Sequence, residues 1–423
     1  MKHRIVVLGA GYGGAYTAGT LARRLSPADV DITVVNAAPE FVQRLRLHQV
    51  AAGQDVAAPR LVDVFAGTSA RLRVARVTAV DPERRIVSVA DAEGGGELGY
   101  DTLVYALGSH VADHGVPGVA EHAFDVATRP AALRLRDRLD QLDRRSESGR
   151  VLVVGDGLTG IEAATEIAES RPGLAVTLIA ARELGAPLSA GARRHLREAC
   201  DRLGVTVVEH TTVEAVEATR ALCADGTVLE SDATVWAAGF AVPPIAAASG
   251  LEVTEAGRIV VDRTMRSVSH PDVYAVGDSV HAVGDNGRPL PMSCASAGFT
   301  AKQATAAVLG RLTGGRIARV KLVYVGNHVS LGRRDALVQF VDAEARAKPK
   351  HLGGANAARI KAAILRTALW GTEHPTFGLP GRKRRLAAVR LSAAPLSAAP
   401  RAAAPDAGVP ERGPRTPAGK AAV

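Results

Sequence analysis

Short apolar runs, glycine-containing turns and helical patterns follow one another in a regular order along the N-terminal region of the chain. Residues 5–8 are continuously apolar, which predicts a short strand that is buried on both faces. A helical pattern follows at residues 13–25, and residues 31–36 predict a second strand. A strand, a helix and a strand in this order are typical of a parallel β-α-β unit.

The same order of elements returns in the middle of the chain. The predicted elements there are a charged helix (130–145), a strand (151–154), a helix (160–169) and three further strands (175–179, 205–208 and 233–236). Gly9 and Gly155, the first glycines of the two strand-to-helix turns, lie 146 residues apart. The repeat is therefore one of architecture rather than of sequence.

The remaining patterns predict connecting segments and a separate C-terminal region. They are an antiparallel excursion (71–89), a strand ending in glycine (100–109), a hinge (115–119), a late strand (272–280), a helix (298–312), a mixed segment (322–341) and a basic helical stretch (355–370). From about residue 391 the chain is rich in Ala and Pro. Such a composition has little to bury and predicts disorder.

Composition sets the broad class of the protein. With 423 residues, of which 47% are hydrophobic and 22% charged, the chain is long enough for two or three domains with their own cores. The three cysteines, Cys200, Cys223 and Cys294, are too far apart for a CxxC motif, so neither a disulfide framework nor a metal site is predicted and a reducing cytoplasm is expected. A buried strand begins almost at the N-terminus and no run of about eighteen or more apolar residues occurs, so neither a signal peptide nor a membrane span is expected.

The formal net charge of +9 is concentrated near the C-terminus. Between Arg346 and Arg390 there are eleven Lys or Arg residues and one acid, Glu373, a local balance of +10. The rest of the chain is close to neutral, and no zinc-finger or aromatic RNA-binding motif accompanies the basic segment. A nucleic-acid partner is therefore not predicted.

The first glycine turn has the sequence GAGYGG and contains Gly9, Gly11 and Gly14. Between a strand and a helix, such glycines allow a tight turn, close approach to a pyrophosphate and close packing of the helix on the strand. The N-terminus of the helix then faces the anion. Asn36 ends the second strand, where an acid usually binds the ribose hydroxyls, and its amide can still donate or accept a hydrogen bond there.

The second glycine turn, GDGLTG, repeats this pattern with Gly155, Gly157 and Gly160. A single glycine motif is weak, but two of them in the same strand–turn–helix context predict dinucleotide binding at both.

With these turns and a late VYAVGD motif at residues 273–278, the chain resembles the flavoproteins of the pyridine nucleotide-disulfide oxidoreductase superfamily. Within it, the type II NADH:quinone oxidoreductases and NADH dehydrogenase-like proteins are most similar. The resemblance implies an α/β fold with two Rossmann-like dinucleotide-binding domains, in which the FAD domain is split around an inserted NAD(P) domain, and a small C-terminal region. The implied division is a first segment of the FAD domain at 1–118, the NAD(P)H domain at 119–250, a second segment of the FAD domain at 251–320, a C-terminal domain with the basic amphipathic stretch at 321–390, and the disordered tail at 391–423.

The resemblance also implies roles for residues around the FAD. The strand that closes the FAD domain ends in Gly108, in the sequence YALGS where the family has ATG. By the same resemblance, Asp278 holds the flavin ribitol and Gly277 allows close approach of the backbone. Ala295 stands where quinone-reducing relatives commonly have a glutamine-bearing AQ motif, and its backbone is expected to approach the flavin.

Two catalytic candidates come from the flanks of these motifs. Glu162, two residues after Gly160, matches a family glutamate that contacts the nicotinamide end. His48 lies where the family chain passes the flavin, together with Arg44 and Arg46, and each of these side chains could donate a proton or bind a phosphate.

A flavin next to a nicotinamide implies hydride transfer from NAD(P)H to FAD and then electron transfer to an acceptor. Residues 41–53 contain no cysteine where disulfide reductases carry a CxxxxC pair, so a dithiol relay is excluded. The predicted function is an FAD-dependent NAD(P)H dehydrogenase with a quinone or similar acceptor. A flavin reductase of the same fold that acts on a protein or an aromatic small molecule is the alternative, as is a non-catalytic flavoprotein that senses the NAD(P)H redox state.

The choice between NADH and NADPH depends on the end of the second strand of the second unit, which continues as Ala180, Ala181, Arg182 and Glu183. An acid at this position favours NAD, and an arginine can accommodate the 2′-phosphate of NADP. Arg182 therefore favours NADPH, but Glu183 is its neighbour and both coenzymes stay open.

The basic C-terminal stretch predicts peripheral attachment to an anionic membrane surface on the cytoplasmic face. Four of its apolar residues can share one helical face, and GRKRR follows at residues 381–385; the four are Ile360, Ala363, Ile364 and Ala368. A dimer contact or a solvated helix is the alternative, and a homodimer is left open.

Overall fold

Two five-stranded parallel sheets form the framework of the protein in a computed structural model that describes residues 1–144, 148–378 and 381–387. The first sheet has the order β19-β7-β1-β2-β3. Its strands are β19 (Val273–Ala275), β7 (Thr102–Tyr105), β1 (His3–Leu8), β2 (Val30–Asn36) and β3 (Ala70–Val74). Because β19 pairs in parallel with β7, a segment that follows the second sheet in sequence returns to the first one.

The second sheet repeats this architecture with the order β12-β11-β10-β16-β9. Its strands are β12 (Thr206–Val208), β11 (Ala175–Ile179), β10 (Arg150–Val154), β16 (Ala233–Trp236) and β9 (Ala123–Phe124). The central strands are buried along almost their whole length, as the continuous apolar runs predict. The predicted α/β class with two Rossmann-like units is confirmed.

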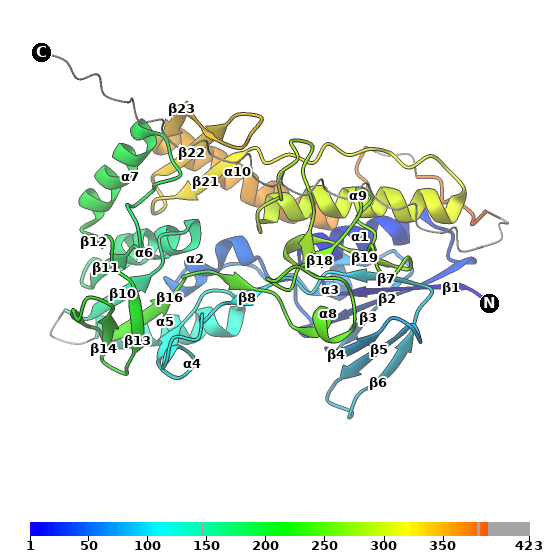
Figure 1. The fold of residues 1–423 in the computed structure, drawn as a ribbon, viewed down its shortest axis with the longest axis horizontal. Coiled ribbons are helices and arrows are strands. Elements are labelled where there is room, and N and C mark those ends of the chain that lie inside the picture. Colours follow the sequence, from blue (N-terminus) through cyan, green and yellow to red (C-terminus); the bar gives the residue numbers. More distant parts are fainter. Residues whose placement is uncertain (145–147, 379–380, 388–423) are drawn as a thin grey trace, which may run out of the picture. The chain divides into compact units, whose positions relative to one another are not determined.

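Helices α1 (Tyr12–Arg24) and α9 (Cys294–Thr313) lie side by side over one face of the first sheet (Figure 1). Helix α1 is rich in buried glycine and alanine, which lets it approach both the sheet and α9 closely. A three-stranded antiparallel meander lies below the sheet in the same view: β4 (Arg76–Asp81), β5 (Ile86–Ala90) and β6 (Gly96–Gly99).

The predicted antiparallel excursion at residues 71–89 is right for β4 and β5 but wrong for its first residues. The segment that forms β3 pairs in parallel with β2, as the edge strand of the first sheet. Its side chains are half-buried or exposed, so its alternating pattern is that of an edge strand and does not reveal the strand's direction.

The second sheet is flanked by α5 (Arg129–Asp143), α6 (Leu158–Ser170) and α7 (Ala190–Leu203). It has its own antiparallel meander, β13 (Val213–Val216), β14 (Arg220–Cys223) and β15 (Val228–Glu230). The two segments that connect the units pair with each other as β8 (His110–Val111) and β17 (Phe240–Ala241). The predicted hinge at residues 115–119 follows shortly after β8.

The C-terminal region consists of a three-stranded antiparallel sheet and one long helix. These are β21 (Gly326–Ser330), β22 (Ala336–Val341), β23 (Ala347–Gly353) and α10 (Gly354–Glu373). Helix α10 packs against the sheet and also against α1 of the first unit. Beyond it, Arg384 pairs with Leu25 through backbone hydrogen bonds, while the predicted tail at 391–423 lies outside the described residues.

Shorter elements complete the described chain. They are η1 (Arg44–Arg46), α2 (Leu47–Ala51), α3 (Leu61–Val64), α4 (Val119–His122), α8 (Ile245–Ala248), β18 (Ile259–Val260), η2 (Gly277–Ser279) and β20 (Val280–His281).

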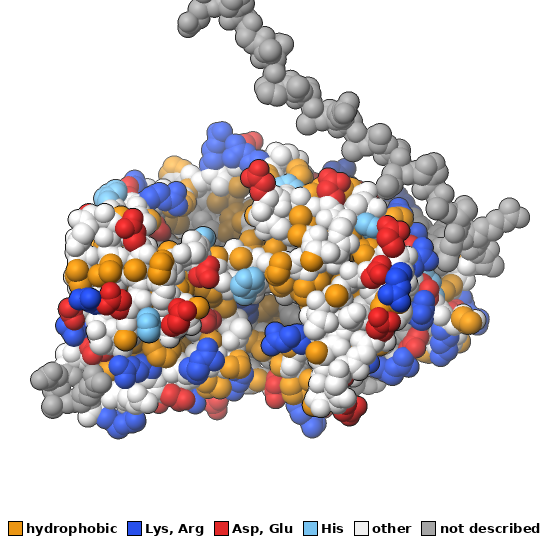
Figure 2. Space-filling view, turned by 60° about the horizontal axis from the view of Figure 1, so that its bottom comes forward, with side chains coloured by type: hydrophobic (Ala, Val, Ile, Leu, Met, Phe, Trp, Pro, Cys, Tyr) orange, Lys and Arg blue, Asp and Glu red, His pale blue; other side chains and the backbone are white. Residues whose placement is uncertain are grey.

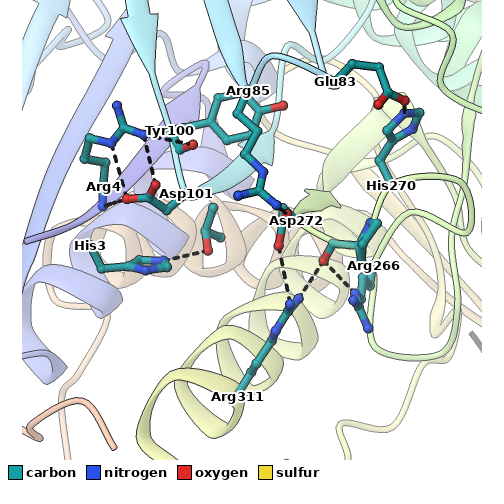
Figure 3. Close-up of polar contacts among 12 residues, drawn as sticks. His3, Arg4, Glu83, Arg85, Tyr100, Asp101, Arg266, His270, Asp272 and Arg311 are labelled. Atoms are coloured by element: carbon teal, nitrogen blue, oxygen red, sulfur yellow. Dashed lines mark hydrogen bonds and ion pairs between the residues drawn. The ribbon is translucent and has the colours of Figure 1, made fainter. Parts of the chain in front are cut away.

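Ion pairs close the amino ends of the strands of the first sheet (Figure 3). Arg4 forms an ion pair with Asp101 at 2.9 Å, and Asp272 forms ion pairs with Arg85 at 2.6 Å and with Arg311 at 3.3 Å. Asp101 and Asp272 immediately precede β7 and β19. The carboxyl ends of the same strands, where the first glycine turn lies, are the ends left for a ligand.

On the face shown in Figure 2, acidic and basic side chains are interspersed with apolar ones. Within the described ranges, no helix is both long enough and apolar enough to cross a bilayer.

Candidate active site

In the first glycine turn, the first and third glycines pack tightly against backbone, whereas the middle glycine borders empty space. Gly9 follows β1 with φ +91°, and a Cβ on it would lie 2.3 Å from the carbonyl oxygen of Ala106. A Cβ on Gly14 would lie 1.9 Å from the carbonyl oxygen of Gly9. A Cβ on Gly11 would meet nothing within 4 Å. This space lies at the N-terminus of α1, which has no side-chain cap, so the turn fits the pyrophosphate of a dinucleotide.

The side chain of Asn36 holds the first turn together. Its Oδ1 accepts a hydrogen bond from the backbone N–H of Ala10 at 2.9 Å, and its Nδ2 donates to the carbonyl oxygen of Ala38 at 2.8 Å. The amide therefore joins β2 to the turn at the edge of the predicted ribose position. Contact with the ribose itself stays a prediction.

The late VYAVGD motif meets the end of β7 next to this turn. Gly277 has φ +79° and its N–H donates to Oγ1 of Thr300 on α9 at 3.1 Å. Asp278 accepts a hydrogen bond from Oγ of Ser109 at 2.7 Å, and Ser279 donates to the carbonyl oxygen of Gly108 at 2.9 Å. Segments far apart in sequence thus place a carboxylate beside the turn, which fits the ribitol contact expected for Asp278.

Arg44 reaches the same place from η1. Its Nη1 donates to the carbonyl oxygen of Ser109 at 2.7 Å and lies 3.9 Å from Oδ2 of Asp278. The guanidinium also lies over the ring of Phe240, 4.9 Å from its centroid. Its Nη2 is buried and has no hydrogen-bond partner among the described residues, so a donor remains for an anionic or carbonyl group.

Helix α9 begins at Cys294, four residues before the predicted start at residue 298. Oγ of Ser293 accepts a hydrogen bond from the N–H of Ser296 at 3.1 Å and so caps the helix. Ala295 is exposed in the first turn. Burial raises the pKa of the Cys294 thiol to about 12, which keeps it protonated and unreactive at neutral pH.

The second glycine turn has the same construction as the first. A Cβ on Gly155, which has φ +117°, would lie 2.5 Å from the carbonyl oxygen of Ala237, and a Cβ on Gly160 would lie 1.8 Å from that of Gly155. Gly157 is again open. A cavity of about 250 Å³ adjoins this turn at the carboxyl ends of β10, β11 and β16. Among the residues that line it are Gly155, Asp156, Gly157, Ala181, Thr211 and Trp236.

Glu162 lies near the start of α6, buried in a cluster of charged groups. Its Oε1 accepts hydrogen bonds from the Ser330 N–H at 2.9 Å and from Nζ of Lys361 at 2.8 Å. Its Oε2 lies 3.9 Å from Nδ1 of His48, which is an electrostatic contact rather than a hydrogen bond. The Lys361 ammonium also donates to the carbonyl oxygen of His328 at 2.7 Å. Both catalytic candidates are thus brought together, with a lysine that the sequence pattern did not reveal.

The electrostatics of this cluster keep Glu162 ionised and His48 neutral. Burial acts to raise the pKa of Glu162, but the Lys361 ammonium and the hydrogen bond from the Ser330 N–H outweigh it, so that the pKa of the carboxyl is lowered. Burial lowers the pKa of His48 and outweighs the opposing effect of Glu162. Nε2 of His48 is buried and has no hydrogen-bond partner in the described portion of the chain.

Lys361 was missed because it belongs to a stretch whose basic residues predicted a surface helix. In α10 the buried face is formed by Ala357, Lys361, Leu365 and Thr372, and Ile360 is 43% exposed. A lysine spaced by four residues from Ala357 and Leu365 was the available signal, since a charge on the apolar face of a helix needs a buried partner.

Arg182 is exposed in the turn after β11 and follows Ala181, which lines the cavity beside the second glycine turn. No cluster of three or more His, Cys, Asp or Glu side chains suited to a metal ion occurs among the residues described.

Comparisons with known proteins agree with this geometry. The profile of a family described as pyridine nucleotide-disulphide oxidoreductase matches residues 3–301. An NADH dehydrogenase-like protein of Mycobacterium tuberculosis is 32% identical over 315 residues, which cover 69% of this chain and 76% of the relative. A demethylphylloquinone reductase of Synechocystis is 24% identical over 349 residues, covering 80% of this chain and 86% of the relative. The structure of NDH2 from Plasmodium falciparum in complex with NADH matches with a TM-score of 0.72 at 15% identity, and covers 90% of this chain and 100% of the other.

Proposed function

Because the chain belongs to the pyridine nucleotide-disulphide oxidoreductase family, we propose that it is an FAD-dependent NAD(P)H dehydrogenase that passes electrons to a quinone. The observation that carries this proposal is the pair of glycine turns. In each of them the outer glycines are locked against backbone and the middle glycine opens onto free space. Two such turns in one chain suit two dinucleotides, of which one stays and one is exchanged.

The residues around the first turn suit the FAD. Gly9, Gly11 and Gly14 would hold its pyrophosphate, and Asp278 its ribitol hydroxyls, with the backbone of Gly108 and Ala295 close by. When bound, FAD accepts a hydride from the nicotinamide and supplies two electrons to the acceptor. The protein contributes orientation and exclusion of water.

Reduction of a quinone by NAD(P)H takes up one proton in addition to the hydride, and the buried cluster around Glu162 suits the supply of that proton. Nζ of Lys361 lies 2.8 Å from Oε1 of Glu162. His48 is neutral, so one of its ring nitrogens can accept a proton from a water molecule and pass it on. Glu162 and His48 are therefore proposed as catalytic residues, and Lys361 as the residue that pairs with the Glu162 carboxylate and holds it in place.

The acceptor is proposed to be a quinone because nothing near the site, within the described residues, suits a dithiol. Residues 41–53 contain no cysteine, and the thiol of Cys294 is held protonated. The Synechocystis relative is named a demethylphylloquinone reductase.

Attachment to the cytoplasmic membrane face is included in the proposal. Trp370 near the end of α10 and Phe377, four residues beyond that end, are 42% and 75% exposed, with their ring centroids 4.9 Å apart. The exposed Arg382 and Lys383 follow. Aromatic side chains beside basic ones suit the interface of an anionic membrane. A homodimer stays a prediction that size-exclusion chromatography with light scattering would test.

The membrane proposal needs a test that leaves the active site intact. Deleting α10 would remove Lys361 as well. The quadruple variant with Trp370→Ser, Phe377→Ser, Arg382→Glu and Lys383→Glu should lose co-sedimentation with vesicles of anionic phospholipid while it keeps its flavin. Undiminished binding of this variant would refute the attachment through this segment.

The enzymatic proposal is tested by the flavin spectrum. The purified protein should be yellow, should bleach anaerobically with NADH or NADPH, and should recover its colour when menadione is added. A protein without flavin would sink the proposal. Bleaching that is reversed by a ferredoxin or an aromatic small molecule but not by a quinone would favour the flavin reductase alternative. A stable reduced protein that no acceptor reoxidises would favour a redox sensor.

A further inference from the structure

The end of β11 is the place where a nucleotide-binding unit distinguishes NADH from NADPH. In the first unit, Leu8 pairs with Val35, and in the second unit Val154 pairs with Ile179. The residue that follows each partner, Asn36 or Ala180, therefore occupies the same position. An acid there binds the ribose hydroxyls of NAD, whereas an arginine nearby accommodates the phosphate of NADP. Ala180 is fully buried and offers neither a carboxylate nor an amide.

Two acids near this position, Glu183 and Glu209, are held away by helix α7. Glu183 forms an ion pair with Arg193 and lies 3.7 Å from Arg197. Glu209 accepts hydrogen bonds from Arg197 and from the N–H of Leu184, both at 2.6 Å. The Arg197 guanidinium and this N–H hold the pKa of the Glu209 carboxyl below its usual range. Both carboxylates are thus neutralised by groups of the protein itself.

Arg182 is the charged side chain that remains beside the end of β11, while Asp156 lines the cavity within the glycine turn itself. Arg182 is exposed and, among the described residues, its guanidinium has no acidic or carbonyl partner. Its neighbour Ala181 lines the cavity beside the second glycine turn, so the arginine stands at the rim where the adenosine ribose of a nucleotide bound to that turn would lie.

We propose that the second unit selects NADPH. Arg182 binds the 2′-phosphate, and Arg193 and Arg197 of α7 form ion pairs with the acids that would otherwise repel it. This inference rests on the proposed function, since it names the electron donor for the same site. A guanidinium suits a phosphate because it presents a fixed fork of donors. The 2′-hydroxyl of NADH offers it no charge, so the arginine discriminates by the phosphate alone.

The first test measures binding and does not depend on turnover. The flavin-loaded protein is titrated calorimetrically with adenosine 2′,5′-bisphosphate and with 5′-AMP. The bisphosphate should bind about 10- to 100-fold more tightly, as expected for a charge-assisted contact, and Arg182→Ala should remove this difference. Arg194→Ala is the matched control, because it removes the same charge from an exposed position on α7 that does not line the cavity.

A second variant adds the missing acid. Ala181 is exposed, so Ala181→Asp changes the rim of the cavity without a change in the core. It should weaken binding of the bisphosphate about as much as Arg182→Ala and leave binding of 5′-AMP within a few-fold of the wild type. Flavin content and thermal midpoint verify that each variant is folded.

The rate of flavin bleaching separates failure of this inference from failure of the proposed function. Faster bleaching by NADPH than by NADH, reversed in Arg182→Ala, supports both. Bleaching by NADH alone, together with equal binding of the two adenosine nucleotides, overturns the NADPH proposal and leaves the dehydrogenase intact. If neither coenzyme bleaches the flavin, the dehydrogenase fails, and the calorimetric comparison still decides whether Arg182 binds the phosphate.

Discussion

The two glycine turns have the same backbone plan but differ in what surrounds it. In the first, the Asn36 side chain ties the end of β2 to the turn. In the second, the equivalent position is Ala180, and a cavity of about 250 Å³ opens beside the turn. Two residues after the last glycine, the first unit has Tyr16 and the second has Glu162. The first turn is thus stabilised by its own side chains, as suits a resident cofactor, and the second is open and charged, as suits a coenzyme that reacts and leaves.

The largest effect is expected where the second unit carries a buried charge. Lys361→Met would leave Glu162 ionised in the interior without its main partner, and should lower the free energy of unfolding by about 3–5 kcal/mol in urea denaturation. The exposed Lys350 provides the control, Lys350→Met, which should change it by less than about 0.5 kcal/mol. Equal stability of the two variants would show that the pair at 2.8 Å contributes nothing.

Matched glycine variants test whether the two turns serve different nucleotides. Gly14→Ala and Gly160→Ala place a Cβ 1.9 Å and 1.8 Å from a backbone oxygen and should each cost about 1–3 kcal/mol, by repacking of helix on strand. A Cβ at Gly11 or Gly157 would meet no described protein atom within 4 Å, so Gly11→Ala and Gly157→Ala should affect only bound ligands. Gly11→Ala should lose flavin absorbance. Gly157→Ala should retain the flavin but reduce it more slowly with NAD(P)H. If Gly157→Ala released the flavin, the assignment of the turns would be wrong.

A smaller effect should follow from opening the first turn. Asn36→Ala removes the hydrogen bonds to Ala10 and Ala38 and should destabilise the protein by about 1–2 kcal/mol, measured by thermal unfolding of the flavin-free form. The flavin should also dissociate faster on dilution. Asn36→Asp keeps the acceptor for Ala10 but loses the donor to Ala38, so it should restore only part of this loss, whereas an effect of side-chain volume alone would restore it fully.

The smallest expected effect is a pH dependence from His48 of α2, which lies beside Glu162 of the second unit. His48 has a lowered pKa in the folded protein because of burial, so it contributes stability above its ordinary pKa of 6.5, and this contribution is lost as the pH falls below that value. His48 contributes at most about 1.4 kcal/mol per pH unit to the change of the unfolding free energy with pH. The pKa of Glu162 is also lowered, so its contribution is lost only at still lower pH.

Unfolding in urea between about pH 7 and pH 5 covers the range around the ordinary histidine pKa. The pKa values of His3, His281 and His328 are also lowered, chiefly by burial, so the contribution of His48 is found by comparing a variant with the wild type. His48→Gln should flatten the stability profile in this range, whereas His122→Gln, at an exposed position, should leave it as it is. A wild-type profile that His48→Gln does not alter would mean that the histidine is accommodated equally well in both protonation states.

The features of this fold that follow from sequence are those whose signal is local. The two turns, their helices and Glu162 are encoded within a few residues of one another, and the sequence predicts all of them. The direction of β3 was missed because its half-buried pattern is the same in a parallel and an antiparallel neighbour. Helix α9 begins earlier than predicted because Ser293, a short-range cap, was overlooked.

The partners of Glu162 could not be predicted in this way. Ser330 and Lys361 reach it from β21 and α10, and only the packing of the C-terminal sheet against α6 brings them together. The predicted roles of Glu162, His48 and Arg182 follow from motif positions. The protonation states of Glu162 and His48, and the absence of an acidic partner for Arg182 among the described residues, depend on neighbours that the sequence spacing does not reveal. The ion pair between Glu183 and Arg193 is likewise a contact that the position of Glu183 beside Arg182 in the sequence does not reveal.

The position of Lys361 in α10 has a consequence for the order in which the protein is made. Both sheets are complete in the nascent chain before this helix leaves the ribosome, and domains fold as units while synthesis continues. Glu162 of the second unit therefore exists for a time without its ammonium partner. The buried ion pair between Glu162 and Lys361 can therefore form only after α10 has been made and has packed against the rest of the described chain, so the charge of this site is settled late in synthesis.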